Sequence, residues 1–241
     1  MKLEKRVDPV TSPTFSFEFF PPKTDGAADA LWLAAAELGA LGPEYMTVTY
    51  GAGGSTREGT LKTILKIRER ASFPVGAHLT FLNSTKKELR EYADRLWNNG
   101  VRHIIALRGD VPADLSWPLD TDDAYFQYTS DFVAGLKSWH DFEISVGCYP
   151  ETHPDALSPE ADIEALKKKC DAGVTRAITQ FFFDNADYYA FIEKCRAAGI
   201  ETPIYPGMLP IHDFRNVERF ATRCRAKIPA WLHERFEGLD D

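Results

Sequence analysis

Residues 97–107, WNNGVRHIIAL, join the polar end of one expected helix to an apolar run through a single glycine. A glycine directly after a helix takes up the left-handed backbone conformation that ends the helix. The apolar run after it is then a strand, entered through a short loop. The same order returns in CDAGVTRAITQFFF (170–183) and AAGIETPIY (197–205). Helix, glycine and strand in this repeating order predict βα units and a parallel sheet.

Extending the pattern in both directions predicts seven βα units. Strands are expected near 14–20, 45–50, 74–80, 102–108, 143–149, 175–182 and 203–208. Helices are expected over roughly 26–41, 56–71, 84–98, 123–139, 159–171, 184–198 and 212–225. Several strands are apolar without alternation, as in sheets that are buried on both faces. We therefore expect a TIM-type (β/α)8 barrel formed as a single domain over residues 1–241.

The eighth βα unit of such a barrel is not evident in the sequence. The segment IPAWLHERFEGLDD (228–241) follows the seventh helix and holds no further strand. An open barrel, an eighth unit from another chain, or a shortened form of a longer protein would each account for this. We expect the chain to be C-terminally shortened. An open doubly wound sheet is less favoured, because no GxGxxG follows the first strand.

Composition and charge exclude several classes of function. The net charge is −8 and the longest basic run is Lys167–Lys169, which argues against nucleic acid as the main partner. The four cysteines form no CxxC pair, so neither a zinc site nor a redox dithiol is indicated. We expect a cytoplasmic protein, because we find neither a signal-like start nor an apolar run long enough to span a membrane.

Polar residues gather at the ends of the expected strands, where barrels of this kind place their active sites. This concentration at one end of apolar strands indicates an enzyme rather than a scaffold. The polar residues concerned are Glu18, Thr49, Tyr50, His78, Arg108, Asp110, Tyr149, His153 and Gln180, with Gly109 between Arg108 and Asp110.

Glu18 is the most distinctive of these residues. Strand alternation places Phe15, Phe17 and Phe19 on one face, and Glu18 and Phe20 on the other. A carboxylate among phenyl rings should be partly desolvated, which raises its pKa toward that of a general acid. The alternative is a structural carboxylate paired with an Arg or Lys at the rim.

Four further strand-end residues leave two interpretations open. Asp110 follows a glycine that would let the backbone approach a ligand, but an aspartate here can also be a turn residue or a helix N-cap. Gln180 either satisfies buried backbone groups or meets a ligand. His78 and His153 lack a second histidine at metal-ligand spacing, so a satisfied histidine or a donor to a ligand is expected rather than a metal site.

Two other patterns are weaker. The loop GAGGST (51–56) resembles a phosphate-binding turn but matches neither the dinucleotide nor the P-loop pattern. Asp162, Ala165, Leu166 and Lys169 share one helix stripe by their spacing. The two charged side chains of this stripe could contact a ribose and a phosphate, or the stripe could simply be a solvated helix face.

Six segments together resemble the bacterial-type 5,10-methylenetetrahydrofolate reductase family. They occur in the family's order, and the resemblance extends from residue 15 to about residue 238. The segments are FSFEFFPPKT (15–24), TVTYGAGG (47–54), HLT (78–80), IIALRGD (104–110), YPETHP (149–154) and ITQFFFD (178–184).

The resemblance implies a TIM-type barrel that holds FAD and reduces a folate with NADH or NADPH, in one-carbon metabolism and methionine supply. It implies that Glu18 delivers the proton that opens the folate's five-membered ring. Asp110 would be the second catalytic residue, anchoring the pterin and tuning the flavin. Gln180 would hydrogen-bond the folate, and Phe220 would pack on the folate or nicotinamide. Residues at flavin-lining positions are Thr49, Tyr50, Ala52, His78, Arg108, Gly109, Asp110, Tyr128, Tyr149, His153, Asp162, Lys168 and Lys169. Similar enzymes are usually homo-oligomers.

The sequence also departs from the family pattern. Lys168 stands where relatives often carry Arg, Ala165 where an Asn can contact the flavin, and Asn216 where a Gln can reach the folate. The family continues beyond GLDD (238–241) with an eighth strand region that contributes an Arg toward the folate. Two alternatives therefore stand beside folate reduction: a flavin barrel that uses another electron donor, and an inactive truncated barrel that acts as a fragment or binding subunit.

Overall fold

The computed structural model describes residues 13–50, 57–69, 73–111 and 123–239. These residues form two compact units, which divide between Ala77 and His78. The division falls inside a strand, β3 (Val75–Thr80), whose first half belongs to the first unit.

The first unit consists of two βα units and the start of β3. Its elements are β1 (Ser16–Phe19), α1 (Asp25–Gly39), β2 (Tyr45–Val48) and α2 (Arg57–Arg68). The strands pair in parallel, with Glu18 opposite Thr47 and Met46 opposite Val75. β2 is buried along its whole length, and Met46 of β2 and Ile64 of α2 are both fully buried. This explains why its sequence shows no alternation.

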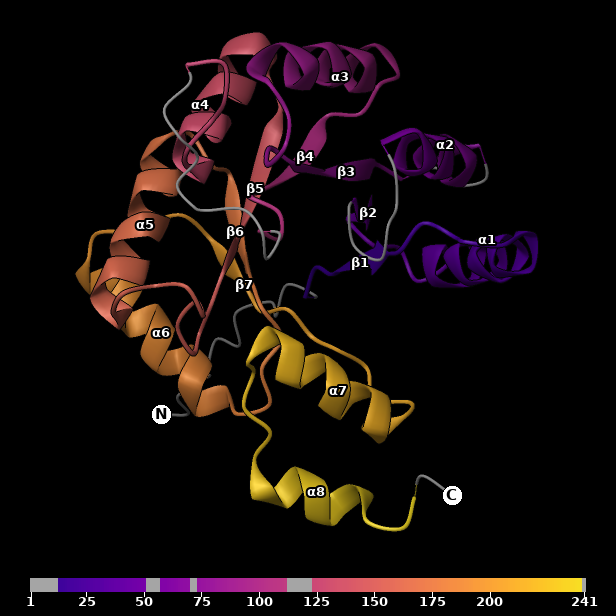
Figure 1. Cartoon of the computed structure of the whole chain (residues 1–241). Helices are drawn as coiled ribbons and strands as arrows, with labels where there is room; N and C mark the ends of the chain where they lie inside the picture. Colours follow the sequence, from indigo (N-terminus) through magenta and orange to yellow (C-terminus); the bar gives the residue numbers. More distant parts are fainter. Residues whose placement is uncertain (1–12, 51–56, 70–72, 112–122, 240–241) are drawn as a thin grey trace, which may run out of the picture. The chain divides into compact units, whose positions relative to one another are not determined.

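The second unit continues the same order. Its elements are α3 (Lys86–Asn98), β4 (His103–Leu107), α4 (Thr129–Trp139), β5 (Glu143–Cys148), α5 (Pro159–Asp171), β6 (Arg176–Thr179), α6 (Asn185–Ala197), β7 (Ile204–Tyr205), α7 (Phe214–Cys224) and α8 (Ala230–Phe236). Helices α4, α5 and α6 lie side by side along strands β4 to β7 (Figure 1). β4 with β5, β5 with β6, and β6 with β7 are parallel pairs.

The glycines that were expected to end helices do so in the structure. Gly100, Gly173 and Gly199 follow α3, α5 and α6, with φ of 77°, 110° and 76°. A side chain at these backbone angles would be strained, so glycine ends each helix at the required place. The chain then enters the next strand within a few residues.

The predicted fold class is confirmed. The described strands follow one another in the sheet in chain order from β1 to β7, and helices alternate with them. This is the order of a TIM-type (β/α)8 barrel. Within the described ranges there are seven strands and no eighth. The single-domain boundary at residues 1–241 stays a prediction.

The structure corrects two expected boundaries and adds one helix. The fourth helix begins at Thr129 rather than near residue 123, because Tyr125 forms an antiparallel bridge with Thr85 and Lys86 N donates to Ala124 O at 2.7 Å. β7 is only two residues long. Helix α8 was not expected; it begins after Pro229 and buries Leu232.

None of the helices in the described parts of the chain combines the length and apolar character needed to cross a membrane.

Candidate functional site

In the first unit, Glu18 and Thr49 lie at the carboxyl ends of neighbouring strands. Thr49 N donates to Phe19 O at 2.9 Å, which continues the β1–β2 ladder past the end of β2. The carbonyl of Thr49 accepts from Thr60 Oγ1 at 2.9 Å. The Thr49 hydroxyl oxygen is buried and finds no hydrogen-bond partner among the described residues. A buried hydroxyl without a partner at a strand end fits a position that a ligand would complete.

The side chain of Glu18 is exposed, which corrects the expectation that phenyl rings desolvate it. Phe15 and Phe17 pack edge to face, with ring centroids 5.5 Å apart, on the opposite face of the strand. Phe20 shares the face of Glu18 but is itself 56% exposed. The alternation was therefore predicted correctly, but it separates Glu18 from the rings instead of surrounding it with them.

Two other candidates belong to this unit. Tyr50 follows Thr49, and the guanidinium carbon of Arg57 lies 6.0 Å from the centroid of the Tyr50 ring. Ala52 and the GAGGST loop (51–56) lie outside the described residues.

In the second unit, the end of β4 carries Arg108, Gly109 and Asp110. Gly109 has φ of 98°, and a Cβ there would lie 3.2 Å from Thr80 Cβ, so a larger residue would be both strained and crowded. Arg108 Nη2 donates to Asp155 Oδ2 at 2.7 Å. Asp110 is exposed and caps no helix in the described ranges, since α4 has Tyr128 at its N-cap. The interpretation of Asp110 as a helix N-cap is therefore wrong for the helices in the described ranges.

His78 lies on β3 and is buried, with 6% of its surface exposed. Tyr128, in contrast, is 58% exposed at the start of α4. Beside Tyr128, both polar atoms of the Gln127 amide are buried without a hydrogen-bond partner in the described part of the chain. Sequence reasoning missed Gln127, because it falls in the segment that was predicted to be helical.

The loop after β5 brings Tyr149 and His153 together, edge to face, with ring centroids 4.5 Å apart. His153 Nδ1 accepts from Asp155 N at 3.0 Å, which leaves Nε2 as the donor of the neutral ring. Burial lowers the pKa of His153 and so favours this neutral form. His153 N donates to Asp162 Oδ2 at 2.7 Å, which attaches the loop to α5.

Three of the four residues of the stripe on α5 are buried or half-buried, and only Ala165 of the four is exposed. Leu166 is buried, and Lys169 Nζ donates to Gly147 O of β5 at 2.8 Å. Burial lowers the pKa of Lys169. The interpretation of this stripe as a solvated face is therefore wrong for Asp162 and Lys169. Lys168 does not belong to the stripe. Its side chain is exposed, and its ammonium forms an ion pair with Glu164 at 2.9 Å.

Gln180 follows β6, and its Oε1 accepts from Phe181 N at 3.0 Å. The Phe181 ring stacks on Phe220 of α7, with centroids 5.3 Å apart and an interplanar angle of 22°. Asn216 lies one turn earlier on α7, where its amide bonds to Asp213 and accepts from Arg219. The structure therefore connects Gln180 with the part of α7 that carries Phe220 and Asn216.

Asp155 was also missed in the sequence, because no motif pointed to it. It pairs with Arg108 from another strand end, and that pairing is visible only in the folded chain. In the described residues, His, Cys, Asp and Glu form no group of three or more that could hold a metal ion.

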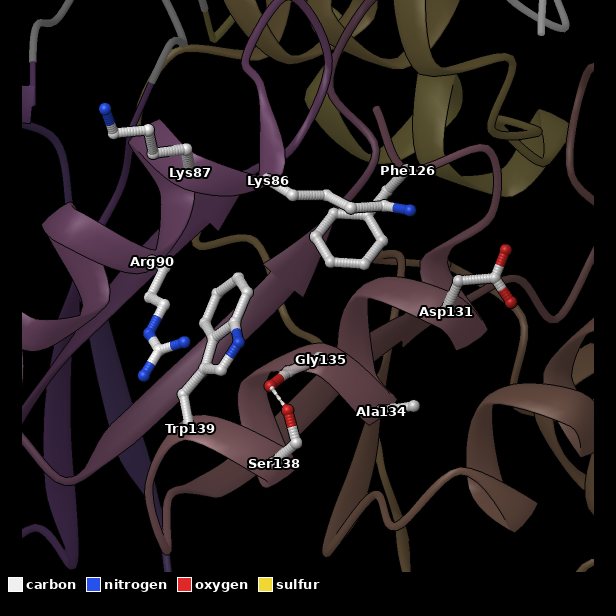
Figure 2. A pocket seen from close by; sticks show the side chains of 9 residues that line it. All are labelled: Lys86, Lys87, Arg90, Phe126, Asp131, Ala134, Gly135, Ser138 and Trp139. Atoms are coloured by element: carbon white, nitrogen blue, oxygen red, sulfur yellow. Dashed lines mark hydrogen bonds between the residues drawn. The ribbon is translucent and has the colours of Figure 1, made fainter. Parts of the chain in front are cut away.

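A separate groove lies between α3 and α4 and holds none of the candidate residues. It is lined by Lys86, Lys87 and Arg90 of α3, and by Trp139 of α4 (Figure 2). Phe126 lies in the same groove, and Lys86 Nζ is 5.3 Å from the centroid of its ring. The candidate site is therefore not this groove.

Comparison with known proteins agrees with the strand-end pattern. A family model described as methylenetetrahydrofolate reductase matches residues 2–241. The chain belongs to this family. It is 46% identical over 226 residues to the 5,10-methylenetetrahydrofolate reductase of Escherichia coli K12, which covers 94% of this chain and 74% of that protein. It is 34% identical to methylenetetrahydrofolate reductase (NADH) 1 of Arabidopsis thaliana, over all of this chain and 43% of that one.

Two solved structures share the fold of this reductase family member at low sequence identity. An uncharacterized protein from Clostridium thermocellum that binds two copies of 5-methyl-5,6,7,8-tetrahydrofolic acid has a TM-score of 0.67 at 14% identity, with 95% of this chain and 77% of that chain covered. Phosphonopyruvate hydrolase in complex with oxalate and Mg²⁺ has a TM-score of 0.55 at 12% identity, with 93% and 90% covered. These two likenesses show the fold alone.

Proposed function

We propose that the chain reduces 5,10-methylenetetrahydrofolate to 5-methyltetrahydrofolate, with FAD as its cofactor and NADH or NADPH as the electron source. The observation that carries the proposal is the similarity to named reductases across 94% of the chain. That similarity supports an oxidoreductase acting on a folate. The cofactor, the electron donor, a cytoplasmic location and a homo-oligomeric state are parts of the proposal.

Each unit has polar groups that suit a flavin ligand. In the first unit the Thr49 hydroxyl, and in the second unit the Gln127 amide before α4, is buried without a hydrogen-bond partner among the described residues. Arg108, Lys169 and the neutral ring of His153 add donors suited to phosphate and hydroxyl oxygens. When bound, FAD supplies the hydride-transfer chemistry.

Glu18 is proposed to deliver a proton to the substrate. Reduction of the one-carbon bridge breaks a carbon–nitrogen bond of the five-membered ring, and the departing nitrogen needs a proton. A protonated carboxyl at the carboxyl end of β1 supplies it and is left as a carboxylate. Because Glu18 is exposed in the described structure, bound substrate must exclude water from the carboxyl group and so raise its pKa.

Asp110 and Gln180 are proposed to orient the folate. The Asp110 carboxylate is exposed after Gly109 and can accept from N–H groups of a pterin. The Gln180 amide can donate from Nε2 while Oε1 stays with Phe181 N. Both residues hold the ring system in position and carry no proton in the reaction.

The test separates the two half-reactions of the Glu18→Gln variant. We expect flavin reduction by NADH or NADPH, followed by flavin absorbance, to keep the wild-type rate. We expect the folate half-reaction to fall by a factor of about 10² or more, the usual contribution of a general acid. Glu37→Gln, the same charge change at an exposed position of α1, should alter neither. Equal loss of both half-reactions in Glu18→Gln would show that its role is structural.

A further inference from the structure

The groove between α3 and α4, which holds none of the candidate residues, has an aromatic floor. Phe126 is buried at its base and packs against α4 at Gly135, where a Cβ would lie 2.6 Å from Phe126 Cζ. Trp139 of α4 is half-buried, with its ring centroid 6.1 Å from that of Phe126. Ala134 and Ser138 of α4 add only small side chains to the lining (Figure 2). The groove has a volume of about 540 Å³, which is the size of a small-molecule site.

The first turns of α3 add three cations to this floor. Lys86 and Lys87 are the first two residues of the helix, and Arg90 follows one turn later. Positive charge is unfavourable at a helix N-terminus, and Lys86 and Arg90 also repel each other at i and i+4. The three cations therefore oppose the stability of α3 itself, in a chain whose net charge is −8. An anion bound between them would reverse both effects.

Little of this positive charge is neutralised within the described residues. Lys87 forms an exposed ion pair with Glu91 at 4.0 Å, and no ion pair of Lys86 or Arg90 is found in the described ranges. Asp131 is the only carboxylate among the described residues that line the groove, and it lies across the groove from Lys87 and Arg90 (Figure 2). Anionic groups of a ligand are therefore directed to the α3 side.

We propose that this groove binds a nucleoside polyphosphate. The three cations pair with the phosphate oxygens, because guanidinium and ammonium groups are strong donors to phosphate. The base packs on the indole ring of Trp139, since bases stack on aromatic side chains. The small side chains of Ala134 and Ser138 leave room for the base and the ribose above α4. This site is separate from the strand ends and does not depend on the proposed reduction of a folate.

The test is a calorimetric titration of the full chain with ATP, tripolyphosphate and adenosine. Mg²⁺ is left out, so that it does not neutralise the phosphates. We expect ATP to bind with a dissociation constant below about 1 mM, and about tenfold more tightly than tripolyphosphate, because the stacking of one base supplies a factor of this size. Adenosine, which has no phosphate group, should bind more weakly than ATP.

Two sets of variants separate the cations from the aromatic floor. Lys87→Gln with Arg90→Gln should weaken the binding of both ATP and tripolyphosphate about tenfold, the factor that two exposed ion pairs can supply. Trp139→Leu keeps an apolar side chain but removes the stacking surface. It should lower the affinity for ATP to that for tripolyphosphate and leave the latter unchanged. Lys62→Gln with Lys194→Gln is the control: it removes two exposed charges from α2 and α6 and should alter neither affinity.

The proposal is overturned if ATP does not bind at about 1 mM, or if the protein with Lys87→Gln and Arg90→Gln binds it as tightly as wild type. The second outcome would place the nucleotide elsewhere, for example at the proposed flavin site, since FAD also has an adenine and phosphates. Equal affinity of wild type for ATP and tripolyphosphate would leave only a polyanion site and would overturn the contact with Trp139. Lys87 and Arg90 are exposed, so their substitution should leave the melting temperature unchanged.

Discussion

His103 is a titratable residue in the interior of the second unit. It lies on β4 with 4% of its surface exposed, and its Nε2 is 2.7 Å from Ser145 Oγ on β5. Burial, with smaller contributions from Arg176 and His78, lowers the pKa of His103 to about 3. The unfolded chain has the ordinary value near 6.5, so below that pH the unfolded state binds a proton that the folded state excludes.

This difference predicts a loss of stability in acid. Because the pKa in the folded state is the lower one, the stability present above pH 6.5 falls as the pH drops below that value. The expected slope is about 1.4 kcal/mol per pH unit, or about 2 kcal/mol between pH 7 and pH 5. Urea unfolding at the two pH values measures it. His103→Asn should lose about 2 kcal/mol less than wild type over this range, and an identical loss in both proteins would contradict the assignment.

At the scale of single residues, the strand face on which a side chain lies could be predicted from the sequence better than its burial and its contacts. Glu18 lies on the predicted face of β1, but its exposure could not be read from its phenylalanine neighbours, because residues adjacent along a strand point to opposite faces. The pairing of Arg108 with Asp155 joins two loops far apart in the sequence. Such pairs depend on how the strands are placed side by side, which no local pattern records.

Among the secondary-structure elements, the end of β6 and the chain after β7 lie in close contact at Gly207. A Cβ at this position would lie 2.2 Å from the carbonyl oxygen of Thr179. Gly207 N also donates to Thr179 Oγ1 at 2.9 Å. The contact therefore depends on the absence of a side chain at Gly207 and on the hydroxyl of Thr179 at the end of β6.

Gly207→Ala should destabilise the protein by about 2 kcal/mol, because the clash is with backbone and cannot be relieved by a rotamer change. Thermal or urea unfolding provides the measurement. Gly26→Ala in α1 is the matched control, since no atom lies within 4 Å of the added Cβ. It should be neutral or stabilising by up to about 1 kcal/mol. Equal effects at both positions would contradict the predicted clash.

The boundaries of elements could be predicted wherever a local signal ends them. Gly100, Gly173 and Gly199 each end a helix where the sequence places them. The start of α4 could not be predicted, because Tyr125 is drawn into a bridge with Thr85, a contact that competes with helix formation. Helix α8 is too short for its periodicity to be evident.

On the scale of the whole molecule, the parallel α/β order could be predicted because a helix, a glycine and an apolar strand follow one another repeatedly, at residues 97–107, 170–183 and 197–205. The division between Ala77 and His78 could not, because it falls within a strand whose sequence shows no break. The proximity of Gln180 to α7 could not be predicted either, because it depends on the stacking of Phe181 on Phe220 in the folded chain.

The four cysteines report on the integrity of the fold. All four are free, and Cys148 and Cys195 are buried. Burial raises the pKa of the Cys195 thiol to about 11 and that of Cys148 further still, so neither forms the reactive thiolate near neutral pH. An aromatic disulfide reagent should therefore modify at most Cys170 and Cys224 quickly in the native protein, and all four thiols in urea. Four fast thiols without denaturant would contradict this burial, and Cys170→Ser with Cys224→Ser should leave only slow ones.

The segment after α7 is attached to the loop after β5 by two bonds. Arg225, which ends α7 in the left-handed conformation, donates from Nη1 to Pro154 O at 3.2 Å. Lys227 N donates to Glu151 Oε2 at 2.9 Å. These two bonds connect the loop that carries Tyr149 and His153 with the end of the helix that carries Phe220, so we expect ordering of one to restrict the other. A ligand that orders one segment reduces the conformational entropy that remains to be lost in the other, so the second ligand binds more tightly. Amide hydrogen exchange in α7 should slow when a ligand occupies the β5 loop, and Glu151→Gln with Arg225→Gln should remove that response.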